Sequence, residues 1–260
     1  MGKNIIIILI FIIVLIICFF ILNNSSKDKI NTTQIENYSP DLINLKNFTF
    51  NVITLHNPDR LTNISEQEKI LPNIQINKFN AIRGIELNQD KLIQDKILTT
   101  DFKYPSTKRS NEIGCYLSHL ELLKSLKNSP ASSHIILEDD FKFVPTTDFI
   151  LSINNVISQT KYNSFDIIFL GWNSSVLNSE KVPWSENLIK FKPTNSFYGT
   201  YAYMVNSNSL DKIINLISQI DMPIDTKYNV LYSANKLDLY WINPIVVEPN
   251  FGLASTILSN

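Results

Sequence analysis

Cysteine is scarce in this chain of 260 residues, which contains only Cys18 and Cys115. Cys18 lies inside a long apolar run and Cys115 far along the chain, so no disulfide can link two parts of the folded region. Two cysteines are also too few for an all-cysteine metal cluster. The folded region must therefore depend on a packed core for its stability.

An excess of positive charge is missing as well. The chain has 23 Lys and Arg against 24 Asp and Glu, which gives a formal net charge of -1 and a pI near 6.3. Nucleic-acid binding depends on a cationic surface that releases counterions from phosphates, so we expect no nucleic-acid partner. The content of 44% hydrophobic and 18% charged residues is typical of a folded chain rather than a disordered one.

The longest hydrophobic run covers residues 5–22, without charge or proline. As a helix this run would reach roughly 27 Å, close to the hydrocarbon thickness of a bilayer. A cleavable signal peptide, the alternative, has a shorter apolar region followed by small residues, whereas Phe19–Leu22 lead directly into Asn23. We therefore expect residues 1–22 to form a short cytoplasmic tail and a transmembrane signal anchor. The domain would face the ER or Golgi lumen in a eukaryotic or viral host and be membrane-associated in a bacterium.

A polar segment follows the apolar run. Residues 23–46 are rich in Asn, Ser, Thr, Lys and Asp, include Pro40 and show no sustained hydrophobic period. Such a composition is typical of a flexible linker, so we expect a stem. Residues 47–260 remain as one folded domain of ordinary size.

Strand-like and helix-like segments alternate along this domain. β-Branched and apolar segments predict strands at residues 48–56, 74–82, 134–137, 165–170, 200–205 and 239–247, the last one broken by Pro244. Apolar residues at helical spacing predict helices that begin at Pro58, near residue 110 and near residue 209, the last one ending at Pro223. This alternation predicts an α/β fold with a mixed or largely parallel sheet, in which ligands bind beyond the carboxyl ends of the strands.

Three adjacent carboxylates, Glu138, Asp139 and Asp140, directly follow the apolar segment at 134–137. Their mutual repulsion requires positive charge nearby. Mg²⁺ and Mn²⁺ bind one or two carboxylates and complete their coordination with water and substrate phosphate. The cluster therefore predicts a site for a metal-bound diphosphate, with a solvated acidic turn as the alternative.

Three further residues and a group of aromatic residues have both a functional and a structural interpretation. His119 lies four residues after Cys115 on one helix, half of a zinc site by spacing, but a packed, hydrogen-bonded histidine is the commoner case. Arg60, in the first turn of a helix, is either a phosphate contact or a surface arginine. Asp225 is a buried base or a turn residue. Aromatic residues suited to stacking on a sugar, or to the core, are Trp172, Trp184, Tyr198, Tyr201 and Tyr203.

Two motifs in fixed order resemble the signature of glycosyltransferase family 25. They are Gly114-Cys115 with Ser118-His119-Leu120, and Glu138-Asp139-Asp140 after one intervening helix. That family includes bacterial lipooligosaccharide galactosyltransferases and collagen hydroxylysine galactosyltransferases. The likeness covers nearly the whole folded part and includes residues 52–55, Arg60 and residues 81–84, 201–205, 223–225 and 255–257. The chain departs from the family pattern at Thr54 and His56.

The resemblance implies a GT-A-like nucleotide-sugar-binding fold with a mixed sheet flanked by helices, and the apolar run at residues 5–22 adds one N-terminal transmembrane helix before it. The resemblance further implies inverting transfer of a hexose, galactose foremost, from a UDP-hexose donor. The acceptor would be a hydroxyl on a glycan, a glycoprotein or a collagen-like chain. A noncatalytic, membrane-tethered glycan-binding protein of the same fold is the alternative.

The resemblance also assigns roles to individual residues. Glu138 and Asp140 would hold Mn²⁺ or Mg²⁺, and Asp225 would be the catalytic base. The residues expected to bind the UDP-sugar are Arg60, Arg83, Ser118, His119, Glu138 and Asp139.

Overall fold

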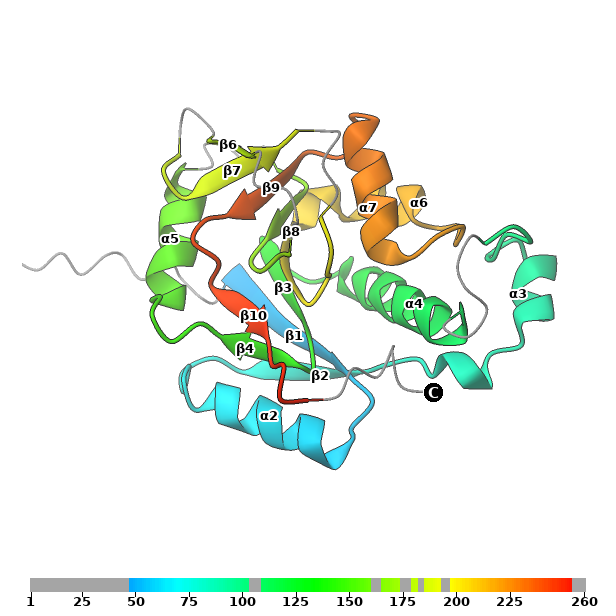
Figure 1. Ribbon diagram of the computed structural model, residues 1–260, viewed down its shortest axis with the longest axis horizontal. Coiled ribbons are helices and arrows are strands. Elements are labelled where there is room, and N and C mark those ends of the chain that lie inside the picture. Colours follow the sequence, from blue (N-terminus) through cyan, green and yellow to red (C-terminus); the bar gives the residue numbers. More distant parts are fainter. Residues whose placement is uncertain are drawn as a thin grey trace, which may run out of the picture. The chain divides into compact units, whose positions relative to one another are not determined.

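An eight-stranded mixed sheet forms the centre of the fold in the computed structural model (Figure 1). The strand order is β2-β1-β3-β8-β5-β9-β7-β6. The strands are β1 (Phe48–Thr54), β2 (Ile76–Asn80), β3 (Ser133–Glu138), β5 (Ile167–Phe169), β6 (Ser179–Lys181), β7 (Leu188–Phe191), β8 (Ala202–Asn206) and β9 (Leu239–Ile242). A separate antiparallel ribbon pairs β4 (Phe141–Phe143) with β10 (Val247–Pro249).

The structure describes residues 47–102, 109–159, 165–173, 179–181, 185–192 and 197–253. The predicted anchor at residues 1–22, the predicted stem at 23–46 and the family-like segment at 255–257 lie outside these ranges. Among the described residues, no helix has the length and apolar character needed to cross a membrane.

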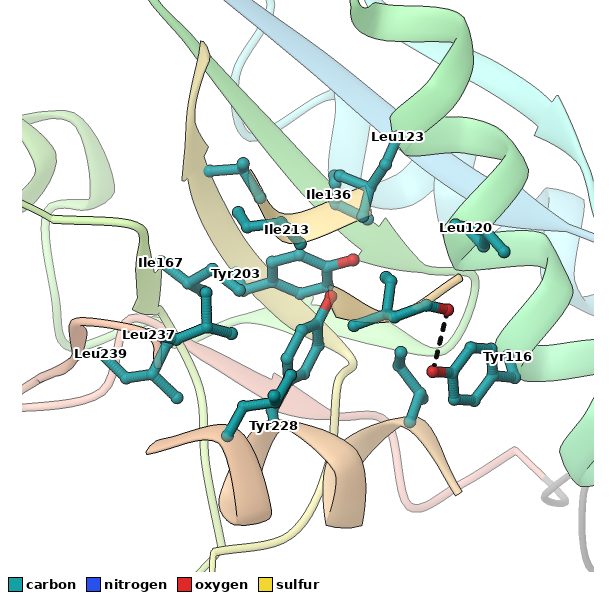
Figure 2. Packing of buried hydrophobic residues seen from close by; sticks show 14 of the residues in the cluster. Tyr116, Leu120, Leu123, Ile136, Ile167, Tyr203, Ile213, Tyr228, Leu237 and Leu239 are labelled. Carbon is teal, nitrogen blue, oxygen red and sulfur yellow. Dashed lines mark hydrogen bonds between the residues drawn. The ribbon is translucent and has the colours of Figure 1, made fainter. Parts of the chain in front are cut away.

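Helices cover both faces of the sheet (Figure 1). They are α2 (Pro58–Glu68), α3 (Gln89–Gln94), α4 (Arg109–Leu126), α5 (Phe149–Gln159), α6 (Leu210–Leu216) and α7 (Ile224–Ser233), with 3₁₀ turns η2 (Gly84–Glu86) and η3 (Ser207–Ser209). Side chains alternate along β3: Ile135 and Leu137 pack in the apolar cluster that includes residues of α2 and α5. Ile136 packs in the opposite cluster with α4, α6 and α7, which Figure 2 shows. The predicted mixed sheet flanked by helices is confirmed.

The strand directions place several carboxyl ends at one edge. β1 is parallel to β2 and β3, while β8 is antiparallel to both β3 and β5. β5 is in turn parallel to β9. Hence β1, β2, β3, β5 and β9 all run in the same direction, and the acidic cluster that follows β3 lies at the edge where these strands end.

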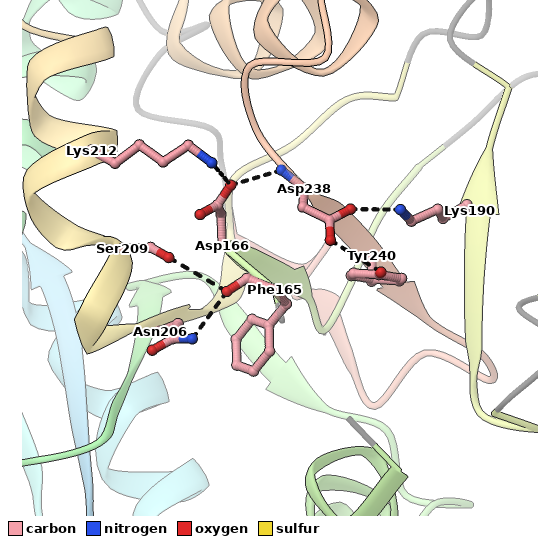
Figure 3. Close-up of polar contacts among 8 residues, drawn as sticks. All are labelled: Phe165, Asp166, Lys190, Asn206, Ser209, Lys212, Asp238 and Tyr240. Carbon is pink, nitrogen blue, oxygen red and sulfur yellow. Dashed lines mark hydrogen bonds and ion pairs between the residues drawn. The ribbon is translucent and has the colours of Figure 1, made fainter. Parts of the chain in front are cut away.

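The opposite edge, where β5 and β9 begin, is held by a network of charged pairs (Figure 3). The buried carboxylate of Asp166 accepts hydrogen bonds from the backbone amide of Asp238, at 2.7 Å, and from Nζ of Lys212, at 2.5 Å. The carboxylate of Asp238 pairs with Nζ of Lys190 at 2.5 Å and accepts a hydrogen bond from the hydroxyl of Tyr240 at 3.1 Å. Each lysine is thus matched by an aspartate, and the network ties β5, β7, β9 and α6 together.

Prolines mark two points at which the chain changes element. The strand predicted at residues 239–247 is interrupted at Pro244 as expected: β9 ends at Ile242, a cis peptide bond joins Asn243 to Pro244, and β10 pairs in the other sheet. The predicted end of a helix at Pro223 is wrong: α6 ends at Leu216, and Pro223 precedes a further helix, α7. Proline is tolerated at a helix start because its fixed φ suits the position and its missing N–H is not needed there.

Candidate active site

Parallel pairing brings the ends of β1 and β3 together. Ile53 of β1 is the register partner of Glu138, so the turn after β1 lies beside the acidic cluster after β3. The backbone amide of Leu55 donates a hydrogen bond to Oδ2 of Asp139 at 3.3 Å. The two bonded residues are 84 positions apart in the sequence. Two distant segments of the chain thus form one edge of the site.

Arg60 supplies positive charge to the acidic cluster. Its Nη1 lies 3.3 Å from Oδ1 of Asp139 and 3.0 Å from Oδ2 of Asp140. Because Arg60 is only 3% exposed, the interpretation as a surface arginine is wrong. We expected a divalent cation to be the positive partner of the cluster; for these two aspartates the protein provides a guanidinium itself.

One face of α2 fixes the backbone of the acidic turn. Nδ2 of Asn63 donates to the carbonyl oxygens of Asp139, at 3.0 Å, and Phe141, at 2.9 Å. Oε1 of Gln67 accepts a hydrogen bond from the backbone amide of Phe143 at 2.9 Å. This role was not predicted from the sequence, although Arg60, Asn63 and Gln67 are polar residues at helical spacing on one side of α2.

Glu138 is anchored at one of its two carboxylate oxygens. Oε1 accepts a hydrogen bond from Oγ1 of Thr200 at 2.8 Å and lies 3.3 Å from Nε2 of His119. Nδ1 of His119 is 2.8 Å from the hydroxyl of Tyr203, which fixes the buried imidazole ring. Burial raises the pKa of Glu138, but the contacts with His119 and Thr200 and the charge of Arg60 outweigh it and hold the pKa below its usual value. The packed interpretation of His119 is confirmed.

The two aspartates of the cluster have the opposite tendency. Burial raises the pKa of Asp139, against the contacts with Thr54, Arg60 and Leu55. Burial, followed by the negative charge of Glu138, raises the pKa of Asp140, against the attraction of Arg60. A further negative charge beside Asp139 and Asp140 would therefore be unfavourable, and a bound cation would be favourable there.

Glu138 and Asp140 each keep an oxygen available for a ligand. Oδ1 of Asp140 is buried and has no hydrogen-bond partner in the part of the chain that the structure describes. Within the same residues, the contacts of Glu138 are made at Oε1, which leaves Oε2. Hard oxygen donors of this kind fit Mg²⁺ or Mn²⁺, so the donor set agrees with the metal ligands implied by the sequence.

A second group of metal-ligating atoms shares Glu138. The ligand atoms of Cys115, His119 and Glu138 all lie within 4.8 Å of one another. Burial, and then the charges of Glu138, Glu112, Asp225 and Asp140, hold the pKa of the Cys115 thiol well above its usual value. This thiol is therefore neither a ready nucleophile nor a ready metal ligand.

Asp225 lies in the first turn of α7, where a carboxylate is favoured by the helix dipole. Its Oδ1 accepts from the backbone amide of Thr226 at 2.6 Å, and its Oδ2 from that of Gly199 at 3.4 Å. Gly199, which contacts Asp225, directly precedes Thr200, which contacts Glu138, so two adjacent residues link Asp225 to the acidic cluster. The sequence had not predicted the helix that carries Asp225.

Arg83 and Ser118 occupy different environments. Nη2 of Arg83 donates to the carbonyl oxygen of Leu55 at 3.5 Å, and its side chain is about half exposed, so it lies at the rim near the end of β1. Ser118 is buried: its Oγ donates to the carbonyl of Gly114 at 2.7 Å and accepts from the amide of Ile82 at 2.8 Å. It attaches the segment before Arg83 to α4, and donor binding by either residue stays a prediction.

Glycine at position 114 allows this attachment. A Cβ atom there would lie 2.6 Å from the backbone nitrogen of Gly84 and from the carbonyl oxygen of Ile82. Real side chains do not approach a backbone this closely, so the glycine of the first motif is needed for α4 to contact the chain after β2.

Comparison with known proteins identifies the family. Residues 47–228 match the family described as Glycosyltransferase family 25 (LPS biosynthesis protein). A "Glycosyltransferase 25 family member" of Drosophila pseudoobscura pseudoobscura is 25% identical over 195 residues, which are 68% of this chain and 30% of that protein. "Procollagen galactosyltransferase 1-A" of Xenopus laevis is 26% identical over 210 residues, 76% of this chain and 32% of that protein. The chain thus spans about a third of the length of these relatives.

Similarity to solved structures is weak. A crystal structure from Bacillus anthracis that is assigned as a glucose-1-phosphate thymidylyltransferase, in complex with a sucrose, has a TM-score of 0.39 and 9% identity. The match covers 75% of this chain and 86% of that one, and it carries no functional conclusion. The family match covers most of the folded part. It includes both motifs as well as Arg60, Thr200 and Asp225. The chain therefore belongs to glycosyltransferase family 25.

Proposed function

We propose that the protein is a metal-dependent, inverting glycosyltransferase with a GT-A-like nucleotide-sugar-binding fold. It would move a hexose, galactose foremost, from a UDP-sugar to a hydroxyl on a glycan, a glycoprotein or a collagen-like acceptor. The observation that carries the proposal is the pair Glu138 and Asp140, whose available oxygens lie at the carboxyl end of β3. Membership of the family and the name of the Xenopus relative support the choice of galactose.

Glu138 and Asp140 would hold Mn²⁺ or Mg²⁺ beside the donor. When bound, the ion supplies positive charge that stabilises the departing diphosphate. Asp139 is already bonded to the amide of Leu55 and paired with Arg60, so it positions the turn. Thr200 and His119 both contact Oε1 of Glu138. The other carboxylate oxygen, Oε2, is the one that would bind the ion.

Asp225 is the proposed base. It would remove the proton of the acceptor hydroxyl while the hydroxyl oxygen forms a bond to the anomeric carbon and the bond from that carbon to the diphosphate breaks. Attack opposite the leaving group inverts the anomeric configuration. The amides of Gly199 and Thr226 fix the position of the carboxylate.

The decisive experiment is Asp140→Asn in the full chain, assayed for UDP-galactose turnover with Mn²⁺ and with chelator. The substitution keeps the size of the side chain but removes a charged oxygen ligand, so we expect turnover to fall at least about a hundredfold. The melting temperature without metal should change little, because one of three repelling carboxylates is neutralised. Asp90→Asn, an exposed acid on α3, is the matched control.

Two outcomes would contradict the proposal. If UDP binds equally well without metal and in Asp140→Asn, Glu138 and Asp140 are not metal ligands. If the wild-type protein binds glycans but turns over no UDP-sugar under any of these conditions, the noncatalytic glycan-binding alternative holds.

A further inference from the structure

Two adjacent residues connect the proposed base with the proposed metal ligand. Oγ1 of Thr200 donates to Glu138 at 2.8 Å, and the backbone amide of Gly199 donates to Asp225 at 3.4 Å. Gly199 has a φ of 93°, a conformation that glycine adopts without strain. Tyr198 directly precedes these two residues in the chain.

The backbone of Tyr198 is fixed while its side chain is not buried. Its amide donates to the carbonyl of Asn173 at 2.9 Å, and the amide of Asn173 donates back to the carbonyl of Tyr198 at 3.2 Å. The residue is nevertheless 52% exposed. About half of this residue is therefore accessible from solvent.

The other aromatic residues considered for sugar stacking have different environments. Tyr201 and Tyr203 are buried in the core. Nε1 of Trp172 donates to the carbonyl of Ile242 at 2.9 Å and its ring packs edge-on against Phe191. Trp184 lies outside the described residues. Among the aromatic residues named from the sequence and described by the structure, Tyr198 thus has the largest exposed fraction.

We propose, building on the proposed function, that Tyr198 is the stacking platform of a hexopyranose subsite. The apolar C–H face of a sugar ring would lie on the aromatic ring, with its hydroxyls directed toward Asp225 and Glu138. A tyrosine has only two side-chain torsions, and here its backbone is already fixed, so ordering the ring costs little entropy on binding. The sugar is either the hexose of the donor or the terminal hexose of the acceptor.

The test measures sugar binding and turnover separately in the full chain. Binding of methyl β-galactopyranoside and of UDP-galactose is followed by ligand-observed saturation-transfer NMR, and turnover by release of UDP. For Tyr198→Ala we expect sugar affinity to fall about tenfold, the scale of an aromatic stacking contact of about 1.4 kcal/mol. Tyr198→Phe keeps the ring and should stay within about twofold of wild type. Leu151→Ala removes a similarly exposed apolar side chain on α5 and should change nothing.

The two sugar sources give different results. Weaker binding of methyl β-galactopyranoside alone assigns the ring to the acceptor, and a raised KM for UDP-galactose hydrolysis assigns it to the donor. Unchanged binding of both sugars in Tyr198→Ala, or equal losses in Tyr198→Phe and Tyr198→Ala, overturns the subsite. If the wild type binds the sugars through Tyr198 without turning over the donor, the subsite stands and the proposed activity fails.

Discussion

Arg60 determines the charge balance of the site at the scale of single residues. Its guanidinium contacts two carboxylates, Asp139 and Asp140, while burial raises the pKa of both. A buried ion pair is not by itself strong evidence for stability, but removing one partner leaves uncompensated charge in the interior. The sequence left Arg60 as either a phosphate contact or a surface arginine, and its burial means that its replacement would affect the folded domain itself.

We therefore predict that Arg60→Ala lowers the free energy of unfolding by about 3 kcal/mol near neutral pH, where the aspartates would have to remain charged without a partner. Urea unfolding followed by circular dichroism measures this loss. Arg83→Ala is the control, because that side chain is about half exposed and should cost under about 0.5 kcal/mol. A stable Arg60→Ala protein that has lost only UDP affinity would restore Arg60 as a diphosphate contact.

His134 links three elements at the scale of secondary structure. It lies on β3, its Nδ1 is 2.7 Å from Oγ1 of Thr49 on β1, and its Nε2 is 3.0 Å from Oγ of Ser207 in η3. Burial lowers the pKa of His134 from 6.5 to about 4, so the folded protein holds the imidazole neutral well below the pH at which an unfolded chain protonates it.

The sign of the pH effect follows from this difference. The contribution of His134 to stability is complete above pH 6.5, is lost as the pH falls toward 4, and is constant below that. The loss amounts to about 3 kcal/mol across this range. We expect His134→Gln, which keeps polar contacts but does not titrate, to lose less stability between pH 7.5 and pH 4.5 than the wild type. The measurement is urea unfolding at both values, with the exposed His56→Gln as control; equal slopes for wild type and His134→Gln would contradict it.

Several elements were predictable because their signals are local. The strand at Phe48–Thr54, the proline at the start of α2 and the apolar stripe of α4 all depend on residues within one or two turns of each other. α7 was missed because Pro223 was taken to end the preceding helix, which ends at Leu216, whereas Pro223 lies at the start of α7. β4 and β10 were missed because each has only three residues and gains stability from its partner strand, about 100 positions away in the chain, as Val247 pairs with Phe143.

At the scale of the whole molecule, the anchor remains a prediction, since residues 1–22 lie outside the described part of the chain. We propose that they hold the protein in a membrane, with the catalytic domain on the lumenal side in a eukaryotic or viral host. A variant that lacks residues 1–23 should be soluble, whereas the full chain should remain in the membrane pellet at high salt.

Protease protection tests the orientation. In intact microsomes the domain should resist added protease and become sensitive after detergent. Digestion without detergent would reverse the orientation, and a truncated protein that still pellets with membranes would show that another segment binds them.

By itself the sequence determined the family, the mixed α/β arrangement and the position of the acidic cluster after a buried strand. These features depend on neighbouring residues and on short motifs, whose hydrophobic pattern and order are read directly from the chain. The tertiary structure decided which groups surround that cluster. Thr200 reaches Glu138 across 62 positions and His119 reaches Tyr203 across 84, and Gly199 holds Asp225. Such contacts depend on how strands are ordered in the sheet and on which side chains lose their water, and no local pattern in the sequence specifies either.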